Sequence, residues 1–129
     1  MKLFYVAPEG ESPPLLAFLD ALEPKLRRKL MGQFLLLLQP PLPREPHVKH
    51  FTIARYSALY ELRARSKVMV RIVFTIMDDG SILFLTPFIK RHSRNTMQAL
   101  DASLKLLSQI NGGTGSVKEL TAEILYGKG

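Results

Sequence analysis

The chain has 129 residues, of which 47% are apolar, and it contains no cysteine. One domain with its own hydrophobic core is therefore expected, and disulfides and thiolate metal sites are excluded. The net charge is +7, and residues 44–94 carry ten Lys and Arg against four Asp and Glu, so nearly all of the excess lies in the middle of the chain. Such a localised excess favours an anionic partner, although a basic solvated surface would give the same count.

The sequence shows no sign of export or of membrane insertion. Its first residues lack the apolar run and the small-residue cleavage site of a signal peptide. The longest apolar run, residues 34–38, is far too short to span a bilayer. We therefore expect a cytoplasmic protein with no membrane partner.

The first part of the chain predicts one strand and two helices. Residues 2–6 have the composition of a short strand, and Ser12 is a suitable N-cap for a helix with two prolines in its first turn. Pro24 ends or offsets that helix, and apolar residues at helical spacing predict a second helix from about Lys25 to Leu38. We interpret the Lys and Arg at positions 25 and 27–29 as its solvated face.

The pattern then changes to a period of two, which predicts three strands at residues 59–65, 68–77 and 82–89. A last helix is expected after Asn95 or Thr96 as its cap, and a Gly-rich segment ends it near Asn111. The order β-α-α-β-β-β-α predicts an α+β fold of two layers, an antiparallel sheet with its helices packed on one face. This domain would cover residues 1–111. Residues 112–129 would form a linker and a short tail, with a loosely attached helix at 116–126 and a frayed end at 127–129.

Strand register converts this pattern into a candidate site, because side chains alternate between the two faces of a sheet. A three-residue connection at 66–68 sets Leu62, Tyr60 and Ala64 opposite Ile72, Phe74 and Val70, which makes one face apolar. The same register sets Arg63 opposite Arg71 on the other face. A second hairpin closed on Asp79 and Gly80 would set Phe74 opposite Leu85 and Ile72 opposite Pro87.

The second face of this sheet is predicted to be basic, and its residues are Arg63, Arg65, Arg71, Phe88 and Lys90, with Arg91 and His92 just beyond the strand. Two arginines directly opposite each other repel, and an anion between them would relieve that repulsion. Two alternatives are open. Arg63 could pair with Glu45 or Glu61, and Lys90 with Arg91 could keep a strand edge from aggregating.

A basic face of this kind suits the cleavage of RNA without a metal, in which the 2′-hydroxyl attacks its own phosphate. The enzyme then needs a base, cations for the phosphate and an acid for the leaving oxygen. Arginine suits the second task because its planar fork binds two phosphate oxygens. His92 and Glu61 are the candidates for proton transfer, whereas His47 and His50 could contact the substrate or have no role. No zinc-binding spacing, phosphate-binding glycine loop or Ser-His-Asp arrangement is evident, so no cofactor is expected.

Three segments, YELRAR at 60–65, VRIVF at 70–74 and LFLTPFIKR at 83–91, are similar to the RelE/ParE toxin superfamily. The likeness is greatest to its phage-derived HigB-like branch, which residues 18–22 and 47–49 also resemble. It implies the toxin of a type II toxin–antitoxin system, neutralised by a small antitoxin that often carries a helix-turn-helix domain. RelE-like members cleave mRNA in the ribosomal A site, and ParE-like members inhibit DNA gyrase. The basic cleavage residues of the family would map onto Arg63, Arg71 and Arg91, with Lys90 beside them.

The chain departs from that branch at residues 92–96, which replace its usual Lys-Thr and proline, and at Met97, near where RelE-like cleavers tend to have a tyrosine. We predict a ribosome-dependent mRNA endonuclease (an mRNA interferase) whose partners are mRNA, the ribosome and a cognate antitoxin. The alternative is a non-cleaving member, either a gyrase-inhibiting toxin or a phage-derived nucleic-acid-binding remnant. The predicted catalytic residues are Arg63, Arg71, Arg91, His92 and Glu61, and the predicted RNA contacts are Arg65, Lys67, Phe88, Lys90 and His50.

Overall fold

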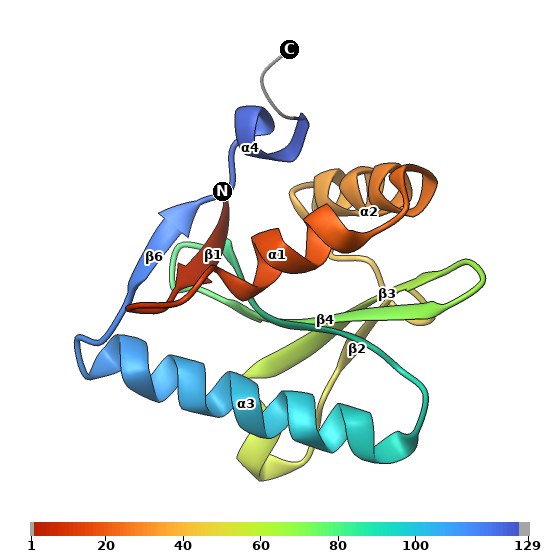
Figure 1. Ribbon diagram of the computed structural model, residues 1–129. Coiled ribbons are helices and arrows are strands. Elements are labelled where there is room, and N and C mark those ends of the chain that lie inside the picture. The colour runs from red at the N-terminus through yellow and green to blue at the C-terminus, as the bar shows by residue number, and fades with distance from the viewer. Residues whose placement is uncertain (1, 127–129) are drawn as a thin grey trace.

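A computed structural model describes residues 2–126 as one mixed sheet with helices on both of its faces (Figure 1). The elements are β1 (Leu3–Ala7), α1 (Pro14–Ala21), α2 (Pro24–Leu37), β2 (Val48–His50), a short 3-10 turn η1 (Ala54–Tyr56), β3 (Leu59–Arg65), β4 (Met69–Ile76), β5 (Ile82–Ile89), α3 (Ser93–Asn111), β6 (Ser116–Glu119) and α4 (Ala122–Tyr126). The α+β class and the predicted order of elements are confirmed, and β2, η1 and β6 are additions that the sequence pattern did not reveal.

Proline begins both N-terminal helices. Pro14 and Pro24 are the first residues of α1 and α2, where a missing N–H costs nothing because that group has no partner within the helix. The N-cap of α1 is Pro13 rather than the expected Ser12. Pro24 therefore separates two helices, as the sequence predicts, by starting the second one.

The strand order is β2-β3-β4-β5-β1-β6, and β1 pairs in parallel with β5 while all other pairs are antiparallel. The sheet is therefore mixed and not purely antiparallel as predicted. The physical reason lies in β1, which is apolar on both sides. Leu3 and Tyr5 pack into one core and Val6 into the other. A strand that is buried on both faces belongs inside a sheet.

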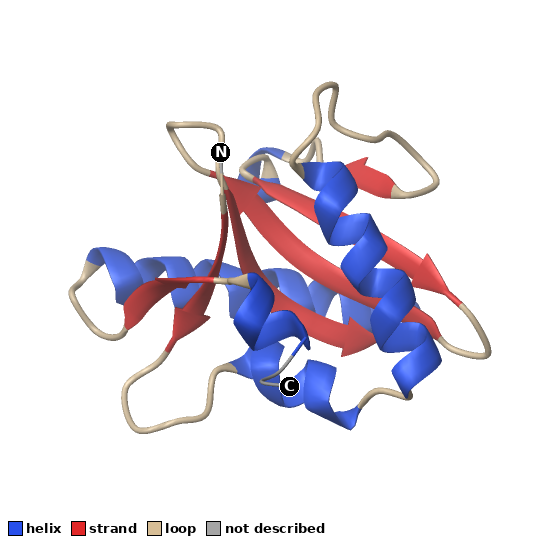
Figure 2. Ribbon diagram, turned by 90° about the horizontal axis from the view of Figure 1, so that it is seen from above, coloured by secondary structure: helices blue, strands red, loops and turns tan. Residues whose placement is uncertain are grey.

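The helices occupy both faces of the sheet, which differs from the expectation that they share one face. In Figure 1, α1 and α2 lie above the sheet and α3 runs below it; Figure 2 shows the same arrangement from above. Val73, Leu83 and Leu85 point to the α3 side, where they pack with Ala99 and Leu100 of that helix. The second face is thus apolar over much of its length, and α3 covers it.

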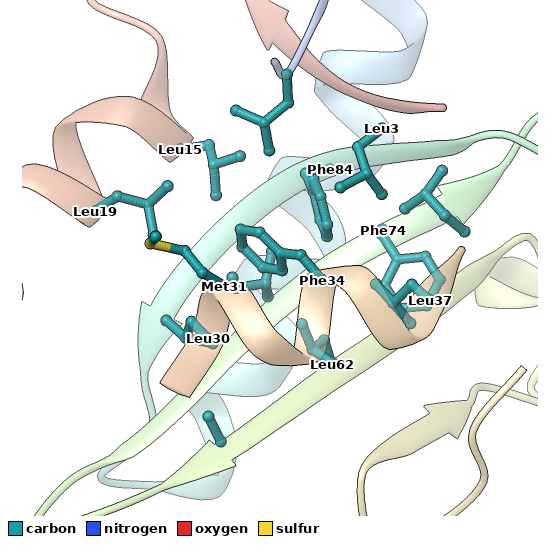
Figure 3. Packing of buried hydrophobic residues seen from close by; sticks show 14 of the residues in the cluster. Leu3, Leu15, Leu19, Leu30, Met31, Phe34, Leu37, Leu62, Phe74 and Phe84 are labelled. Atoms are coloured by element: carbon teal, nitrogen blue, oxygen red, sulfur yellow. The ribbon is translucent and has the colours of Figure 1, made fainter. Parts of the chain in front are cut away.

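The larger core lies between the sheet and the helices α1 and α2. Phe34 of α2 is fully buried and its ring centroid lies 4.6 Å from that of Phe84 on β5 (Figure 3). Phe74 and Leu62 complete this layer from β4 and β3. Burying an aromatic side chain of this size contributes roughly 2 to 3 kcal/mol, so this contact anchors α2 over the centre of the sheet.

The predicted register of β3 against β4 is confirmed at every pair. Leu62 lies opposite Ile72, and Arg63 lies opposite Arg71. In the second hairpin Ile72 does lie opposite Pro87, but Phe74 pairs with Phe84 and not with Leu85. The prediction for Phe74 is wrong because the ladder shifts by one residue between Val73 and Phe74. The extra residue of this β-bulge places Leu85 against α3, where it is buried.

The C-terminal segment is part of the folded unit rather than a loosely attached helix. Residues 116–119 form β6 and pair with β1, and the backbone N–H of Leu120 donates to the carbonyl of Leu3 at 2.8 Å. Leu120 and Leu125 are buried in the larger core. Arg27 of α2 donates to the carbonyl of Leu125 at 3.0 Å. Residues 127–129, which the sequence predicts to fray, lie outside the described residues. Between residues 2 and 126 no helix is long and apolar enough to cross a membrane.

We expect the Leu120→Ala substitution to lower the free energy of unfolding by about 2 to 5 kcal/mol, because it leaves a cavity in the core. The control is Tyr126→Ala, since Tyr126 is 61% exposed and its loss should change that free energy by less than about 0.5 kcal/mol. Urea unfolding followed by circular dichroism measures both. If both substitutions lowered the free energy of unfolding by the same small amount, the C-terminal segment would unfold separately from the sheet.

Candidate functional site

Arg63 of β3 and Arg71 of β4 lie directly opposite each other on the face of the sheet that carries α3. Their side chains are only 23% and 11% exposed, so both are largely sheltered from water. Two cations in such a position repel more strongly than two on an open surface, because less water screens them. Their arrangement therefore requires a nearby negative charge.

Glu61 supplies that charge. Its carboxylate oxygen Oε1 lies 2.9 Å from Nε of Arg63 and 3.6 Å from Nε of Arg71, and its side chain is 1% exposed. Of the two pairings that the sequence left open for Arg63, the one with Glu61 is present. The repulsion between the arginines is thus relieved inside the protein, and no bound anion is needed for the fold.

Burial lowers the pKa of Arg71 below its ordinary value, and the neighbouring Arg63 and Arg65 lower it further. The charge of Glu61 opposes this shift and raises the pKa of Arg71. Because the ordinary pKa of a guanidinium is so high, Arg71 stays charged at neutral pH in spite of this shift. The consequence is a cation held at reduced hydration, which binds an incoming anion more strongly than a fully hydrated one.

A cleft of about 370 Å³ opens beside this pair, and we call it the arginine cleft. It follows the edge of β3 beyond the last residue that β2 covers. Its lining consists of Lys29, Gln33, Pro46, His47, Arg63, Ala64, Arg65, Met69 and Arg71.

Two residues of this lining, Lys29 and Gln33 of α2, were missed by sequence reasoning. Gln33 donates from Nε2 to the carbonyl of Arg63 at 2.8 Å, and Lys29 donates from Nζ to the carbonyl of Arg65. Lys29 is exposed, in agreement with the predicted solvated face, and it also lines the cleft. No sequence signal reveals these two contacts, because both join residues thirty or more positions apart.

A second hollow of about 360 Å³, which we call the strand-end hollow, adjoins the arginine cleft and shares Arg65 and Met69 with it. Its lining consists of Arg65, Ser66, Lys67, Val68, Met69, Ile89, Lys90 and Arg91. The backbone N–H of Lys90 donates to the carbonyl of Met69 at 2.8 Å, which holds the end of β5 beside the β3–β4 turn. Among residues 2–126, the two hollows together are lined by seven Lys and Arg and by no Asp or Glu.

The turn from β5 into α3 is held by Asn95. Its Oδ1 accepts hydrogen bonds from the backbone N–H groups of Arg91, at 2.9 Å, and of His92, at 2.8 Å. The N-cap of α3 is His92 and not Asn95 or Thr96 as predicted, because the helix begins earlier, at Ser93. Asn95 nevertheless satisfies the helix start from within its first turn, in the manner of a capping box.

The remaining predicted residues are distributed around this surface. Phe88 pairs with Arg71 across the sheet and packs partly against the α3 core. His92 is exposed at the start of α3 and lines neither hollow. His50 is not brought to the arginines. It stacks on Tyr60, with ring centroids 4.3 Å apart, and Tyr60 faces the α2 core.

Between residues 2 and 126 no group of three His, Asp or Glu side chains could hold a metal ion.

Residues 17–108 match the model of a protein family described as "Phage derived protein Gp49-like (DUF891)". The match covers more than two thirds of the 129 residues. The chain belongs to the Gp49-like family. This family is part of the RelE/ParE-like toxin superfamily, so the predicted superfamily is confirmed. Among curated proteins no relative matches the chain. The family match includes α2, the hairpin of β3 and β4, β5 and most of α3, and hence every residue of both hollows.

In this Gp49-like protein, the Asn95→Ala substitution should lower the free energy of unfolding by about 1 kcal/mol, because two backbone N–H groups at the helix start lose their acceptor. Asn95→Asp keeps the acceptor oxygen and should stay close to the wild-type stability. Urea unfolding of both variants tests this. A similar loss in the two variants would mean that the oxygen of Asn95 does not hold the junction.

Proposed function

We propose that this Gp49-like protein is the toxin of a type II toxin–antitoxin system and acts as a ribosome-dependent mRNA endonuclease. The observation that carries the proposal is the continuous basic surface of the arginine cleft and the strand-end hollow. RNA is the partner that such a surface suits, because successive phosphates present a row of anions to a row of cations. Membership in a superfamily of toxins supports the same function.

In the proposed reaction the 2′-hydroxyl oxygen forms a bond to the adjacent phosphorus while the bond from phosphorus to the 5′-oxygen breaks. The proton of the 2′-hydroxyl passes to a base, and an acid protonates the leaving 5′-oxygen. Arg63 and Arg71 would hold the non-bridging oxygens, whose charge grows in the transition state. They are suited to this task because their side chains are largely sheltered from water and are held beside each other.

The other basic residues would hold the RNA backbone on either side of the scissile phosphate. Arg65, Lys67, Lys90 and Arg91 line the strand-end hollow and would bind neighbouring phosphates. His92 follows Arg91, is exposed and is proposed to transfer protons, since an imidazole can both accept and donate a proton. We infer a cytoplasmic site of action, where the ribosome is found, and a small antitoxin, of the helix-turn-helix kind, as the partner.

A second candidate function is the binding of nucleic acid, or of gyrase, without cleavage. The observation that favours it is the burial of Glu61, one of the two residues expected to act as base. This candidate predicts an association that weakens with salt and no new RNA ends. It uses the same surface, so only a measurement of cleavage separates it from the first.

The Arg71→Ala substitution tests the proposal. It should reduce mRNA cleavage by about 100-fold or more, because one of the two cations at the phosphate is lost, and it should relieve growth arrest on induction. The measurement is the mapping of mRNA 5′ ends shortly after induction of the toxin gene, with and without the gene that neighbours it.

Arg55→Ala is the matched control. It removes the same side chain and the same charge, but Arg55 pairs with Asp101 at 3.2 Å and lines neither hollow. This variant should remain toxic. Full toxicity of Arg71→Ala would refute the assignment of the arginine pair. Growth arrest by the wild-type protein without new mRNA ends would favour the second candidate.

A further inference from the structure

Glu61 is an acidic residue beneath a surface whose charged lining residues, among residues 2–126, are all Lys or Arg. Its side chain is 1% exposed, and both of its ion pairs use the same oxygen, Oε1. The second oxygen, Oε2, is buried and has no hydrogen-bond partner within residues 2–126. A buried carboxylate with an unsatisfied oxygen is costly, so its presence calls for a role that an apolar side chain could not fill.

Two simpler roles fit these observations poorly. A general base must reach the proton that it removes, but both oxygens of Glu61 are covered by protein and Oε1 is engaged by two arginines. A purely structural role is also a weak explanation, because buried ion pairs seldom stabilise a fold more than apolar residues of the same size would. What distinguishes Glu61 is its contact with both members of the arginine pair.

We propose that Glu61 is a positioning residue, which holds Arg63 and Arg71 side by side and reduces the formal charge of the trio from +2 to +1. This inference rests on the proposed function, in which these arginines bind the scissile phosphate. The cross-strand pairing alone would drive the two guanidinium groups apart. With Oε1 between them, the guanidinium groups of Arg63 and Arg71 would both face the position of the scissile phosphate. An entering phosphate would then meet a site that is already assembled.

Arg71 shows why the carboxylate has to be charged. Burial and the neighbouring Arg63 and Arg65 lower the pKa of Arg71, whereas Glu61 raises it. The carboxylate thus offsets the cost of keeping a guanidinium at 11% exposure. A neutral residue of the same shape would leave Arg71 to move toward water, where its charge is better hydrated.

The first experiment measures the arginines themselves and needs no RNA. In protein labelled with ¹⁵N-arginine, the Nε–H signals of Arg63 and Arg71 should exchange slowly with water, because the first donates to Oε1 of Glu61 at 2.9 Å and the second is buried 3.6 Å from the same oxygen. In Glu61→Gln, which keeps the shape and removes the charge, both should exchange at least tenfold faster, while the signal of Arg55 stays unchanged. Glu61→Met is a second neutral variant, with no amide group to satisfy, for use if the Gln variant fails to fold. Unchanged exchange in a folded neutral variant would overturn the proposal.

The second experiment measures how the binding of a short single-stranded RNA depends on salt. The slope of log K against log salt concentration should steepen by about 0.7 in the neutral variants, because one more cation is free to neutralise a phosphate. Glu61→Asp keeps the charge and should keep the wild-type slope. Arg65→Gln calibrates the scale, since it removes one cation of the surface and should flatten the slope by about the same amount.

Cleavage on ribosomes completes the test, and the neutral variants should lose it at least tenfold although they bind RNA at low salt. Loss of cleavage with unchanged slope and unchanged arginine exchange would assign Glu61 to proton transfer and overturn the positioning role. Absence of RNA binding by the wild-type protein, together with faster arginine exchange in Glu61→Gln, would refute the proposed function while the positioning of the arginines stands.

Discussion

The side chains of β3 and β4 alternate between the two faces of the sheet, and both the core and the basic surface depend on this alternation. The register that buries Leu62 against Ile72 beneath α2 is the same one that sets Arg63 against Arg71 on the other face. A slip of one residue would turn Arg63 and Arg71 into the apolar core beneath α2 and remove Leu62 and Ile72 from it, which is costly for both pairs. The apolar layer around Phe34 therefore determines where the cations lie (Figure 3).

A basic surface assembled in this way carries an internal cost, because a rigid sheet cannot move its paired arginines apart. Glu61 reduces the repulsion between the two arginines. It lies on the same strand as Arg63, two residues before it, and therefore on the same face. The carboxylate lies beneath the arginines, and the lining of both hollows contains only basic charge. The surface consequently presents its positive charge outward, and Glu61, the counterion beneath it, is hidden from a partner.

The edge of β3 that faces away from β4 has a second consequence for the site. Because β2 is only three residues long and pairs with β3 no further than Leu62, residues 63–65 have no β-strand on that side, although the N–H of Arg63 donates to the carbonyl of His47 at 2.8 Å. Gln33 and Lys29 of α2 satisfy two of its carbonyls, so the helix both closes the edge and lines the arginine cleft. A strand edge with no adjacent strand could pair with another molecule and aggregate, but here the helix and His47 bond to it and it forms part of the candidate binding surface.

The sequence by itself determined most of the helices and strands, though not β2, η1 or β6, and it determined the register of β3 against β4. Leucine and proline spacing predicted α1 and α2, and period-two alternation predicted Arg63 opposite Arg71, because these depend on neighbours close along the chain. The tertiary structure decided what distant segments do. It placed β1 beside β5, α3 on the second face, β6 at the sheet edge and Leu85 in a bulge. The tertiary structure also made Glu61, and not Glu45, the partner of Arg63, and it placed Lys29 in the lining of the arginine cleft. Such contacts follow from packing across the whole core, and no pattern of nearby residues encodes them.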